Sequence, residues 1–383
     1  MTCPLIELGE LMARRSGSVD PTRFPDEEFE LHSIPAFDAG RPEFLFGSQI
    51  GSSKQIVQPN DVMISKIVPH IRRASVVGSS PGRRQIASGE WIVFRSVRVF
   101  SRYLRHVLIS DEFNRKFMAT VSGVGGSLLR ARPAEVAKIK IPLPALDEQR
   151  RIAGILDKAD ALRAKRREAI AKLDQLLQSV FLDMFGDPIT NPMSWPMGKL
   201  AELGELDRGV SRHRPRGAPE LLDGKHPLIQ TGDVARSAGY IRDFTATYSD
   251  AGLAQSKKWP SGTLCITIAA NIAETGILTF DACFPDSVVG FTANRTSNAE
   301  FVQALMGFLR GILEEKAPQV AQKNINLAIL RELPVPIPPI ERQKNWALFA
   351  ARVEQMRQRF RAADVSNSKL FVSLQRDVFT GPL

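Results

Sequence analysis

The chain has 383 residues and a formal net charge of +10, with a pI near 9.7, so its basic excess favours a polyanionic partner, most often nucleic acid. Its composition, 43% hydrophobic and 24% charged, is typical of a folded soluble protein, and no apolar run reaches the roughly 18 residues of a membrane span. Three cysteines and the absence of a signal-peptide pattern favour a reduced, cytoplasmic setting.

The first 140 residues predict a compact domain with mixed strands and helices. Alternating apolar residues after a turn predict a strand within residues 58–77, and residues 91–100 predict a second strand. Residues 104–121 predict a helix, and a glycine-containing polar loop follows it. This mixture predicts an α+β fold.

A long helix follows, over residues 147–185, which contain no Gly or Pro except Gly154. About 39 residues at ~1.5 Å each make a rod of roughly 58 Å, longer than the usual globular helix. Apolar residues recur at spacings of three and four, as in a coiled coil, with one polar position at Arg166. The predicted seam is Ile155, Ala159, Leu162, Leu173, Leu176 and Val180.

The second half of the chain repeats this plan. Residues 199–206 resemble residues 5–11, and residues 259–278 match residues 58–77 at a shift of 201. A strand is predicted within residues 287–295 and a helix over residues 298–315. The chain therefore contains a second α+β domain with loop insertions of its own.

Residues 341–379 repeat the first rod without a gap at a shift of 194, so that Gln343 matches Gln149. Two rods of one period favour an antiparallel coiled coil between them, although each could instead pack on its own domain. We predict domains at 1–140 and 188–334, with spacer helices at 141–187 and 335–383. The second seam is Phe349, Val353, Met356, Phe360, Leu370 and Leu374.

Basic and amide residues in the loops are the candidate DNA contacts. Arg and Lys bind phosphates, Arg reads guanine edges, and Asn or Gln can pair with adenine. Any single one is more often a solvated charge or a turn residue. The candidates are Lys66, Arg72, Arg73, Arg83 and Arg84 in the first domain, and Arg212, Arg214, Arg216, Arg236, Lys257, Lys258, Gln322, Lys323, Asn324 and Asn326 in the second.

Catalytic motifs are sparse in the sequence. There is no P-loop and no HExxH motif, and the five His residues lack metal-ligand spacing. Asp286, Glu314 and Lys316 fit the loose pattern of Mg-dependent PD-(D/E)xK nucleases, which leaves a nuclease as one alternative. A coiled-coil adaptor that does not read DNA is another.

The whole chain resembles the specificity (S) subunit of type I restriction–modification systems. The resemblance rests on IPLPALDEQRRIAGILDKADALRAK with the rod that follows, on FGDPITNPMSWPMGKLAELGEL, and on the second VPIPPIERQ. Arg342, Trp346 and Asn367 depart from the family pattern in the second rod.

The resemblance implies a non-catalytic subunit whose two target recognition domains read the two halves of a split DNA sequence. It implies that the helices set the gap between the halves and bind two methyltransferase (modification) subunits, which a restriction (motor and nuclease) subunit joins. S-adenosylmethionine, ATP and Mg²⁺ are then expected on those partners, with no cofactor, metal or catalytic residue on this chain.

Overall fold

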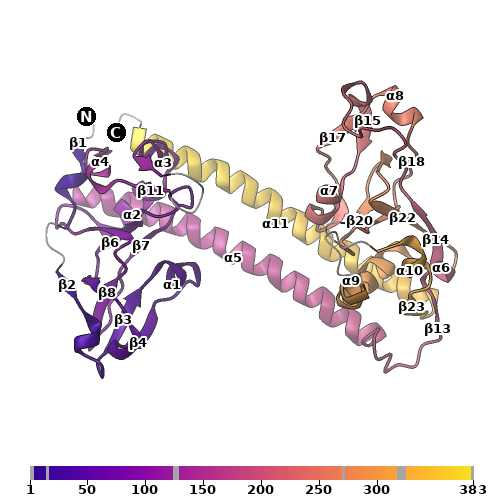
Figure 1. Cartoon of the computed structure of the whole chain (residues 1–383), viewed down its shortest axis with the longest axis horizontal. Coiled ribbons are helices and arrows are strands. Elements are labelled where there is room, and N and C mark those ends of the chain that lie inside the picture. The colour runs from indigo at the N-terminus through magenta and orange to yellow at the C-terminus, as the bar shows by residue number, and fades with distance from the viewer. Residues whose placement is uncertain (1–3, 14–16, 124–128, 270–271, 317–324, 381–383) are drawn as a thin grey trace. The chain divides into compact units, whose positions relative to one another are not determined.

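The computed structural model divides the chain into two compact units, which Figure 1 shows. Unit 1 comprises Met1–Glu168 and Arg361–Leu383, and unit 2 comprises Ala169–Phe360. The structure describes residues 4–13, 17–123, 129–269, 272–316 and 325–380, without the side chains of residues 316, 364–372 and 374–380. Each unit includes a part of both long helices, as the boundaries of the units require.

Unit 1 is built around a three-stranded antiparallel sheet in the order β7-β6-β9 and a five-stranded sheet in the order β2-β5-β8-β3-β4. The short ladders β1·β12 and β10·β11 complete it. The strands are β1 (Leu5–Glu7), β2 (Ser18–Val19), β3 (Glu28–His32), β4 (Glu43–Phe46), β5 (Lys54–Ile56), β6 (Val62–Ser65), β7 (Ala74–Val76), β8 (Arg84–Ala87), β9 (Trp91–Phe94), β10 (Val121–Ser122), β11 (Arg130–Ala131) and β12 (Lys140–Pro142). The short helices are α1 (Ile34–Asp38), α2 (Ser101–Ile109), α3 (Asp111–Met118) and α4 (Pro133–Val136).

Strand β6 explains why the central strands of unit 1 have continuous apolar sequences. All four of its residues are buried, because both faces of the sheet are covered. Val62 and Ile64 join the core that includes residues of α2, whereas Met63 joins a second core with Trp91. Alternate residues therefore fill two different cores.

The helix predicted over residues 104–121 is wrong in one respect, since the structure has two helices there, α2 and α3. Ser110 ends α2 with an extended backbone and begins α3, where its hydroxyl accepts the N–H of Phe113 at 3.3 Å. Asp111 and Glu112 follow in the first turn. A serine followed by two acidic residues is a helix-start signal inside the apolar pattern.

Unit 2 has a five-stranded sheet in the order β14-β22-β19-β20-β16 and a four-stranded sheet in the order β17-β15-β21-β18. The strands are β13 (Met197–Lys199), β14 (Gly204–Arg208), β15 (Leu222–Leu228), β16 (Gly239–Ile241), β17 (Ala246–Tyr248), β18 (Lys258–Trp259), β19 (Leu264–Thr267), β20 (Thr275–Leu278), β21 (Ala282–Cys283), β22 (Val288–Ala293) and β23 (Pro334–Pro336). Its own helices are α6 (Leu200–Leu203), α7 (Thr231–Arg236), α8 (Asp250–Ala254), α9 (Ala299–Lys316) and α10 (Leu327–Arg331).

The two units share a common set of paired strands. The central run β7-β6-β9 of unit 1 corresponds to β20-β19-β22 of unit 2, and β5-β8-β3-β4 corresponds to β18-β21-β15-β17 with the same parallel and antiparallel pairings. The ladder β1·β12 likewise corresponds to β13·β23. The predicted α+β fold with two pseudo-repeated domains is confirmed.

The long helices are α5 (Leu146–Phe185) and α11 (Ile340–Thr380), and they pack antiparallel. Within unit 1, a guanidinium N–H of Arg166 donates to the carbonyl oxygen of Ala363 at 3.2 Å. Within unit 2, Arg357 of α11 forms an ion pair with Asp174 of α5. Because α5 positions rise as α11 positions fall, the predicted antiparallel pairing of the rods is confirmed.

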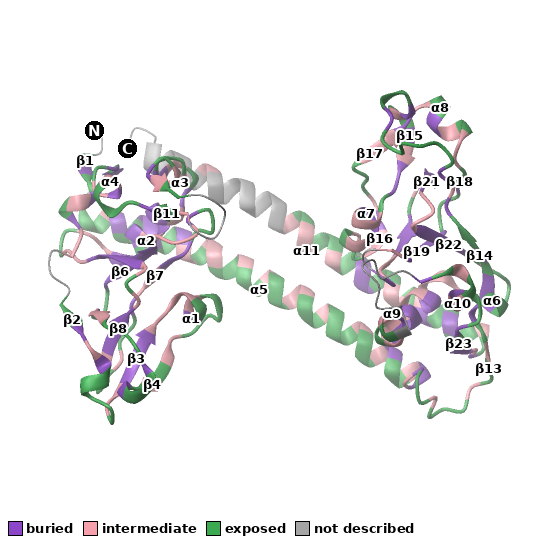
Figure 2. Cartoon of the chain, viewed as in Figure 1, coloured by how far each residue is buried: buried purple, intermediate pink, exposed green. Residues whose placement is uncertain are grey.

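The side of α5 that is turned away from solvent differs from the predicted seam by one residue at several positions. Ile155, Leu162 and Leu176 are 40%, 50% and 42% exposed, and Met356 of α11 is 42% exposed. Figure 2 shows exposed and half-buried residues alternating along the middle of α5. The buried and half-buried stripe contains Gln149, Ile152, Leu156, Ala159, Arg163, Arg166, Ile170, Leu173, Leu177, Val180 and Met184 on α5, and Gln343, Trp346, Ala350, Val353, Arg357 and Phe360 on α11.

The period and the shift of 194 hold in these stripes, because Arg163 and Arg357 occupy matching positions. Ala159, Leu173, Val180, Val353 and Phe360 lie on them as predicted, and Phe349 is half-buried against the core of unit 2. The aliphatic part of an arginine side chain can cover apolar surface. On the buried stripe, Arg163 and Arg357 therefore occupy the positions that the sequence pattern had assigned to the adjacent Leu162 and Met356. Leu370 and Leu374 lie outside the described side chains.

A buried histidine makes the stability of unit 1 depend on pH. His106 is fully buried, and its Nε2 lies 2.8 Å from a carboxylate oxygen of Asp157. Burial lowers the pKa of His106, and the nearby Arg105 acts in the same direction, while the bond to Asp157 opposes them. The unfolded chain therefore binds a proton more readily, and stability is lost as the pH falls below the ordinary histidine value of about 6.5.

We expect His106→Gln to flatten this loss of stability between about pH 7 and pH 5. The measurement is chemical denaturation of both proteins at several pH values. His32, whose pKa is also lowered by burial, keeps part of the dependence. The control is His70→Gln, since His70 is exposed, and an equal flattening in that variant would contradict the assignment.

Candidate nucleic-acid interface

Two loop segments of unit 2 bring together a basic cluster. The segments 208–216 and 255–258 are joined by a β-bridge between Ser211 and Ser256. The backbone N–H of Arg212 donates to the side-chain oxygen of Gln255 at 2.7 Å. This unit 2 basic cluster consists of Arg208, Arg212, Arg214, Arg216, Lys257 and Lys258.

Few carboxylates balance these six cations. Asp286 pairs with Arg214 at 3.6 Å and with Arg216, and Lys257 pairs with Asp207 at 3.6 Å. Arg208, Arg212 and Lys258 form no ion pair with the residues that the structure describes. The cluster therefore carries a positive excess on an exposed loop surface, which suits phosphate groups.

The other candidates in unit 2 do not join this cluster. Arg236 lies on α7 and pairs with Asp233 at 2.7 Å. Asn326 caps α10, since its side-chain oxygen accepts the N–H of Ile329 at 2.8 Å, which favours the structural reading over base contact. Gln322, Lys323 and Asn324 lie outside the described residues.

Unit 1 presents a different surface, in which arginines lie over exposed phenylalanines. Arg83 lies 5.0 Å from the ring centroid of Phe44, and Arg84 lies 4.5 Å from that of Phe24. Phe24, Phe44 and Phe46 are 41%, 52% and 50% exposed. Glu28 and Glu27 hold the two guanidinium groups at 2.5 and 2.9 Å. This Arg–Phe surface offers cations and flat apolar rings together, the combination that contacts phosphates and bases.

Three further candidates of unit 1 lie elsewhere. Arg73 is buried, and both of its bonds go to Asp38, at 2.7 and 2.8 Å, so its assignment to DNA contact is corrected to a structural ion pair. Arg72 is 39% exposed and pairs with Asp111. Lys66 is half-buried, and its backbone N–H donates to Glu90 at 2.9 Å.

The nuclease alternative receives no support from the described side chains. Asp286 pairs with two arginines of the basic cluster, and Glu314 pairs with Arg310 at 2.8 Å. The side chain of Lys316 is not among those described. No group of three His, Cys, Asp or Glu residues within the described part of the chain could hold a metal ion.

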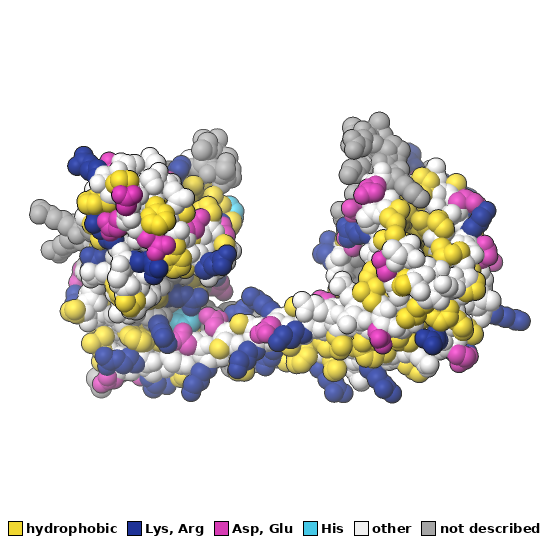
Figure 3. All heavy atoms as spheres, turned by 90° about the horizontal axis from the view of Figure 1, so that it is seen from below, with side chains coloured by type: hydrophobic (Ala, Val, Ile, Leu, Met, Phe, Trp, Pro, Cys, Tyr) yellow, Lys and Arg dark blue, Asp and Glu magenta, His cyan; other side chains and the backbone are white. Residues whose placement is uncertain are grey.

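Figure 3 shows Lys and Arg side chains interspersed with acidic and hydrophobic side chains on the face that it draws. The basic excess is therefore distributed over that face. The sequence reading missed Arg208 and the three phenylalanines. The Arg-Arg pair at 83 and 84 was visible, but its aromatic partners come from strand β4 and from residue 24, which only the fold brings near.

The chain thus combines a duplicated α+β unit, an antiparallel pair of long helices and cations on the loops of the units. A family model described as the type I restriction modification DNA specificity domain matches residues 53–172 and 192–355. The chain belongs to this family, which confirms the resemblance read from the sequence. No helix in the described ranges is both long and apolar enough to cross a membrane.

Individual relatives agree with this assignment. The chain is 23% identical over 229 residues to the MjaX type I restriction enzyme specificity subunit of Methanocaldococcus jannaschii. The match covers 56% of this chain and 52% of the relative, so the chain spans about half the length of that relative.

Two solved structures share the fold at low sequence identity. The S subunit of a type I restriction–modification system from M. genitalium has a TM-score of 0.62 at 12% identity and covers 98% of this chain and 96% of its own. A chain from a structure concerned with complex assembly and conformational transition of the type I R-M system has a TM-score of 0.59 at 20% identity, covering 100% and 98%.

Proposed function

We propose that this chain reads a bipartite DNA target and directs the modification and restriction subunits of a type I complex to it. The observation that carries the proposal is the repeated topology, in which each unit displays cations on its own loops and edges. Each unit then binds one half-site. Cations on flexible side chains position the duplex through phosphates, and a subset of arginines reads guanine edges in the major groove.

The unit 2 basic cluster supplies the first test. We expect the double variant Arg212→Gln/Lys258→Gln to reduce the slope of log K against log salt by about 2, because each lost phosphate contact removes about 0.9. Both side chains are exposed, so the fold is expected to persist. The measurement is duplex binding by fluorescence anisotropy at several salt concentrations.

The matched control is Arg236→Gln, an exposed cation of the same unit that is held by Asp233 outside the cluster. We expect it to leave the slope unchanged. A wild-type affinity that does not depend on salt would favour the alternative function, an adaptor that binds proteins and reads no DNA.

Exposed apolar residues of the long helices are the proposed docking sites for the modification subunits. In unit 1, Ile155 and Leu162 of α5 are exposed at a spacing of seven residues. In unit 2, Leu348 and Met356 of α11 are 63% and 42% exposed. Apolar residues seven or eight positions apart lie near one side of a helix and can pack against a further helix, so each unit offers a site for one of two subunits.

We expect Ile155→Ser/Leu162→Ser to reduce the number of bound modification subunits from two to one, as measured by native mass spectrometry of the co-expressed complex. Exposed substitutions of this kind change the stability of the chain little. The control is Ala161→Ser/Ala164→Ser, which alters exposed positions on the same helix. Retention of two subunits by the leucine and isoleucine variant would contradict this docking site.

We further propose that S-adenosylmethionine, ATP and Mg²⁺ bind the partner subunits and that this chain catalyses no step itself. The partner subunits supply the methyl transfer and the cleavage, while this chain selects the DNA. Cytoplasmic localisation follows from the same proposal, since the complex acts on the DNA of the cell.

A further inference from the structure

Strand β16 of unit 2 has no counterpart among the described strands of unit 1. Strand β16 pairs in parallel with β20, with Tyr240 opposite Ile277. It lies in the segment 237–245 between α7 and β17. The corresponding segment of unit 1, between α1 and β4, has only residues 39–42, which are too few for a turn, a strand and a return. No strand of the described part of unit 1 therefore occupies the position beside β7 that matches β16.

The backbone of β7 is unpaired on that side among the described residues. The N–H of Ser65 donates to the oxygen of Arg73 at 3.0 Å, and the N–H of Val77 donates to Asp61 at 2.9 Å. In an antiparallel pair the bonded residues alternate, so Ala74 and Val76 direct their N–H and C=O groups away from β6. These groups make no hydrogen bond to the described residues. They form an unpaired strand edge, of which Val76 is half-buried and Ala74 only 3% exposed, so a partner reaches the edge at Val76 first.

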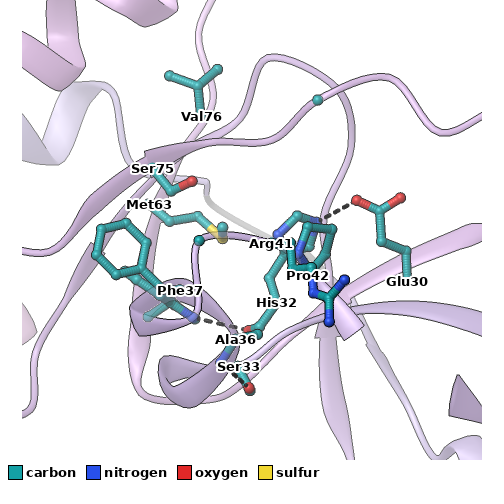
Figure 4. A pocket seen from close by; sticks show the side chains of 13 residues that line it. Glu30, His32, Ser33, Ala36, Phe37, Arg41, Pro42, Met63, Ser75 and Val76 are labelled. Atoms are coloured by element: carbon teal, nitrogen blue, oxygen red, sulfur yellow. Dashed lines mark hydrogen bonds and ion pairs between the residues drawn. The ribbon is translucent and has the colours of Figure 1, made fainter. Parts of the chain in front are cut away.

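Two hollows flank this edge and share Phe37, Ser75 and Val76. The first is about 420 Å³ in volume and is also lined by Met63 and Trp91; Figure 4 shows Phe37, Met63 and Val76 around it. The second hollow, of about 430 Å³, is also lined by Arg102, Arg105 and Asp157. One side of the unpaired edge is thus largely apolar and the other is basic.

In unit 2, the corresponding edge of β20 is paired with strand β16, whose contacts show what a strand at this position meets. The side chain of Gln303 on α9 donates to the backbone oxygen of Gly239 in β16. The hydroxyl of Tyr240 donates to Glu300 at 3.4 Å. Ile241, the next residue of the strand, is 1% exposed in a core cluster. Alternate residues of the added strand therefore face α9 and the core.

At the equivalent positions of unit 1, two arginines replace the acid and the amide of unit 2. Gln149 and Gln343 each accept the N–H of the residue that begins the covering helix, Phe100 in unit 1 and Asn298 in unit 2. Counting from these residues, Arg102 matches Glu300, and Arg105 matches Gln303. A strand beside β7 would therefore meet two arginines where β16 meets an acid and an amide.

We propose that the unpaired edge of β7 binds an extended segment of a partner protein. The segment pairs parallel to β7, places an apolar residue beside Phe37 and Met63, and places acidic residues beside Arg102 and Arg105. Main-chain hydrogen bonds to Ala74 and Val76 supply affinity, and the alternate side chains supply specificity. This site is independent of DNA reading.

The arginines that face the proposed segment already contact carboxylates of this chain but can bind further ones. Arg102 contacts Asp157 at 3.4 Å and Arg105 contacts Asp160 at 3.6 Å. A guanidinium has five N–H donors, so each arginine can hold a further carboxylate. Arg41, on the wall of the first hollow, is exposed and forms no ion pair with the described residues. It adds to the attraction for an acidic segment.

The test uses the full chain and two labelled peptides. One has the sequence of residues 237–243, Ser-Ala-Gly-Tyr-Ile-Arg-Asp, and the other carries Tyr240→Glu and Arg242→Glu. We expect the acidic peptide to bind about tenfold more tightly by fluorescence anisotropy, as two partly exposed ion pairs allow. Hydrogen exchange is expected to slow at the amides of Ala74 and Val76.

The variant Arg102→Glu/Arg105→Gln copies the residues of unit 2 and is expected to reverse the preference for the two peptides. Arg115→Glu, an exposed change on α3, is expected to leave it unchanged. Equal affinities, or unprotected amides at Ala74 and Val76, would overturn the proposal. So would displacement of the acidic peptide by duplex DNA, or protection that rises with protein concentration alone, which would make the occupant a second copy of the chain.

Discussion

Phe181→Ala is expected to lower the free energy of unfolding of unit 2 by about 4 kcal/mol. Phe181 lies near the end of α5 and is 1% exposed. Its ring lies 5.0 Å from that of Phe308 and 5.3 Å from that of Trp346. Truncation therefore removes a buried ring and leaves a cavity where α5, α9 and α11 meet. The expected cost is large because the flanking aromatic rings are rigid and fill such a cavity poorly.

Leu182→Ala is the matched control, since Leu182 follows Phe181 on the same helix and is 38% exposed. We expect it to cost less than about 1 kcal/mol. Chemical denaturation followed by tryptophan fluorescence is the measurement, because Trp195, Trp259 and Trp346 all belong to unit 2. Similar midpoints for the two variants would show that the aromatic cluster does not hold α5 in unit 2.

The sequence predicted the long helices well because their period is a local property. A shift of 194 aligned Gln149 with Gln343, and the two side chains do occupy matching buried positions. The seam was displaced at Leu162 because the reading assigned apolar residues to the buried face. Arg163 lies on that face instead, and its charge is met at the rim by Asp160 at 3.5 Å. A hydrophobicity pattern alone cannot distinguish an arginine stem from a solvated charge.

The sequence pattern could not predict contacts between residues that are distant in the chain. Arg73 looks like any loop cation in the sequence, but Asp38, far away in the chain, lies beside it in the fold. The parallel pairing of β3 with β8 and of β16 with β20 joins segments with long connections between them. Local propensity fixes neither the partner nor the register of such strands. The candidate DNA contacts could therefore be collected from the sequence by type but not grouped into surfaces.

Gln149→Leu is expected to destabilise unit 1 by about 3 kcal/mol, and Gln343→Leu is expected to do the same in unit 2. Each side chain is fully buried near the start of a long helix. Gln149 accepts the N–H of Phe100 at 2.7 Å and donates to the carbonyl oxygens of Arg98 and Pro144 at 3.1 and 2.8 Å. Leucine fills a similar volume but leaves these three backbone groups without a partner, and burial makes each omission costly.

Gln343 makes the same three kinds of contact, with Asn298, Thr296 and Pro338 at 3.1, 3.1 and 2.8 Å. Because each glutamine fastens a long helix to the domain of its own unit, we expect each substitution to speed hydrogen exchange in that unit alone, in α2 for Gln149→Leu and in α9 for Gln343→Leu. The controls are Gln178→Leu and Gln355→Leu, exposed positions on the same two helices. Faster exchange in both units after either single substitution would contradict separate roles for the two glutamines. It would mean that the two units unfold together.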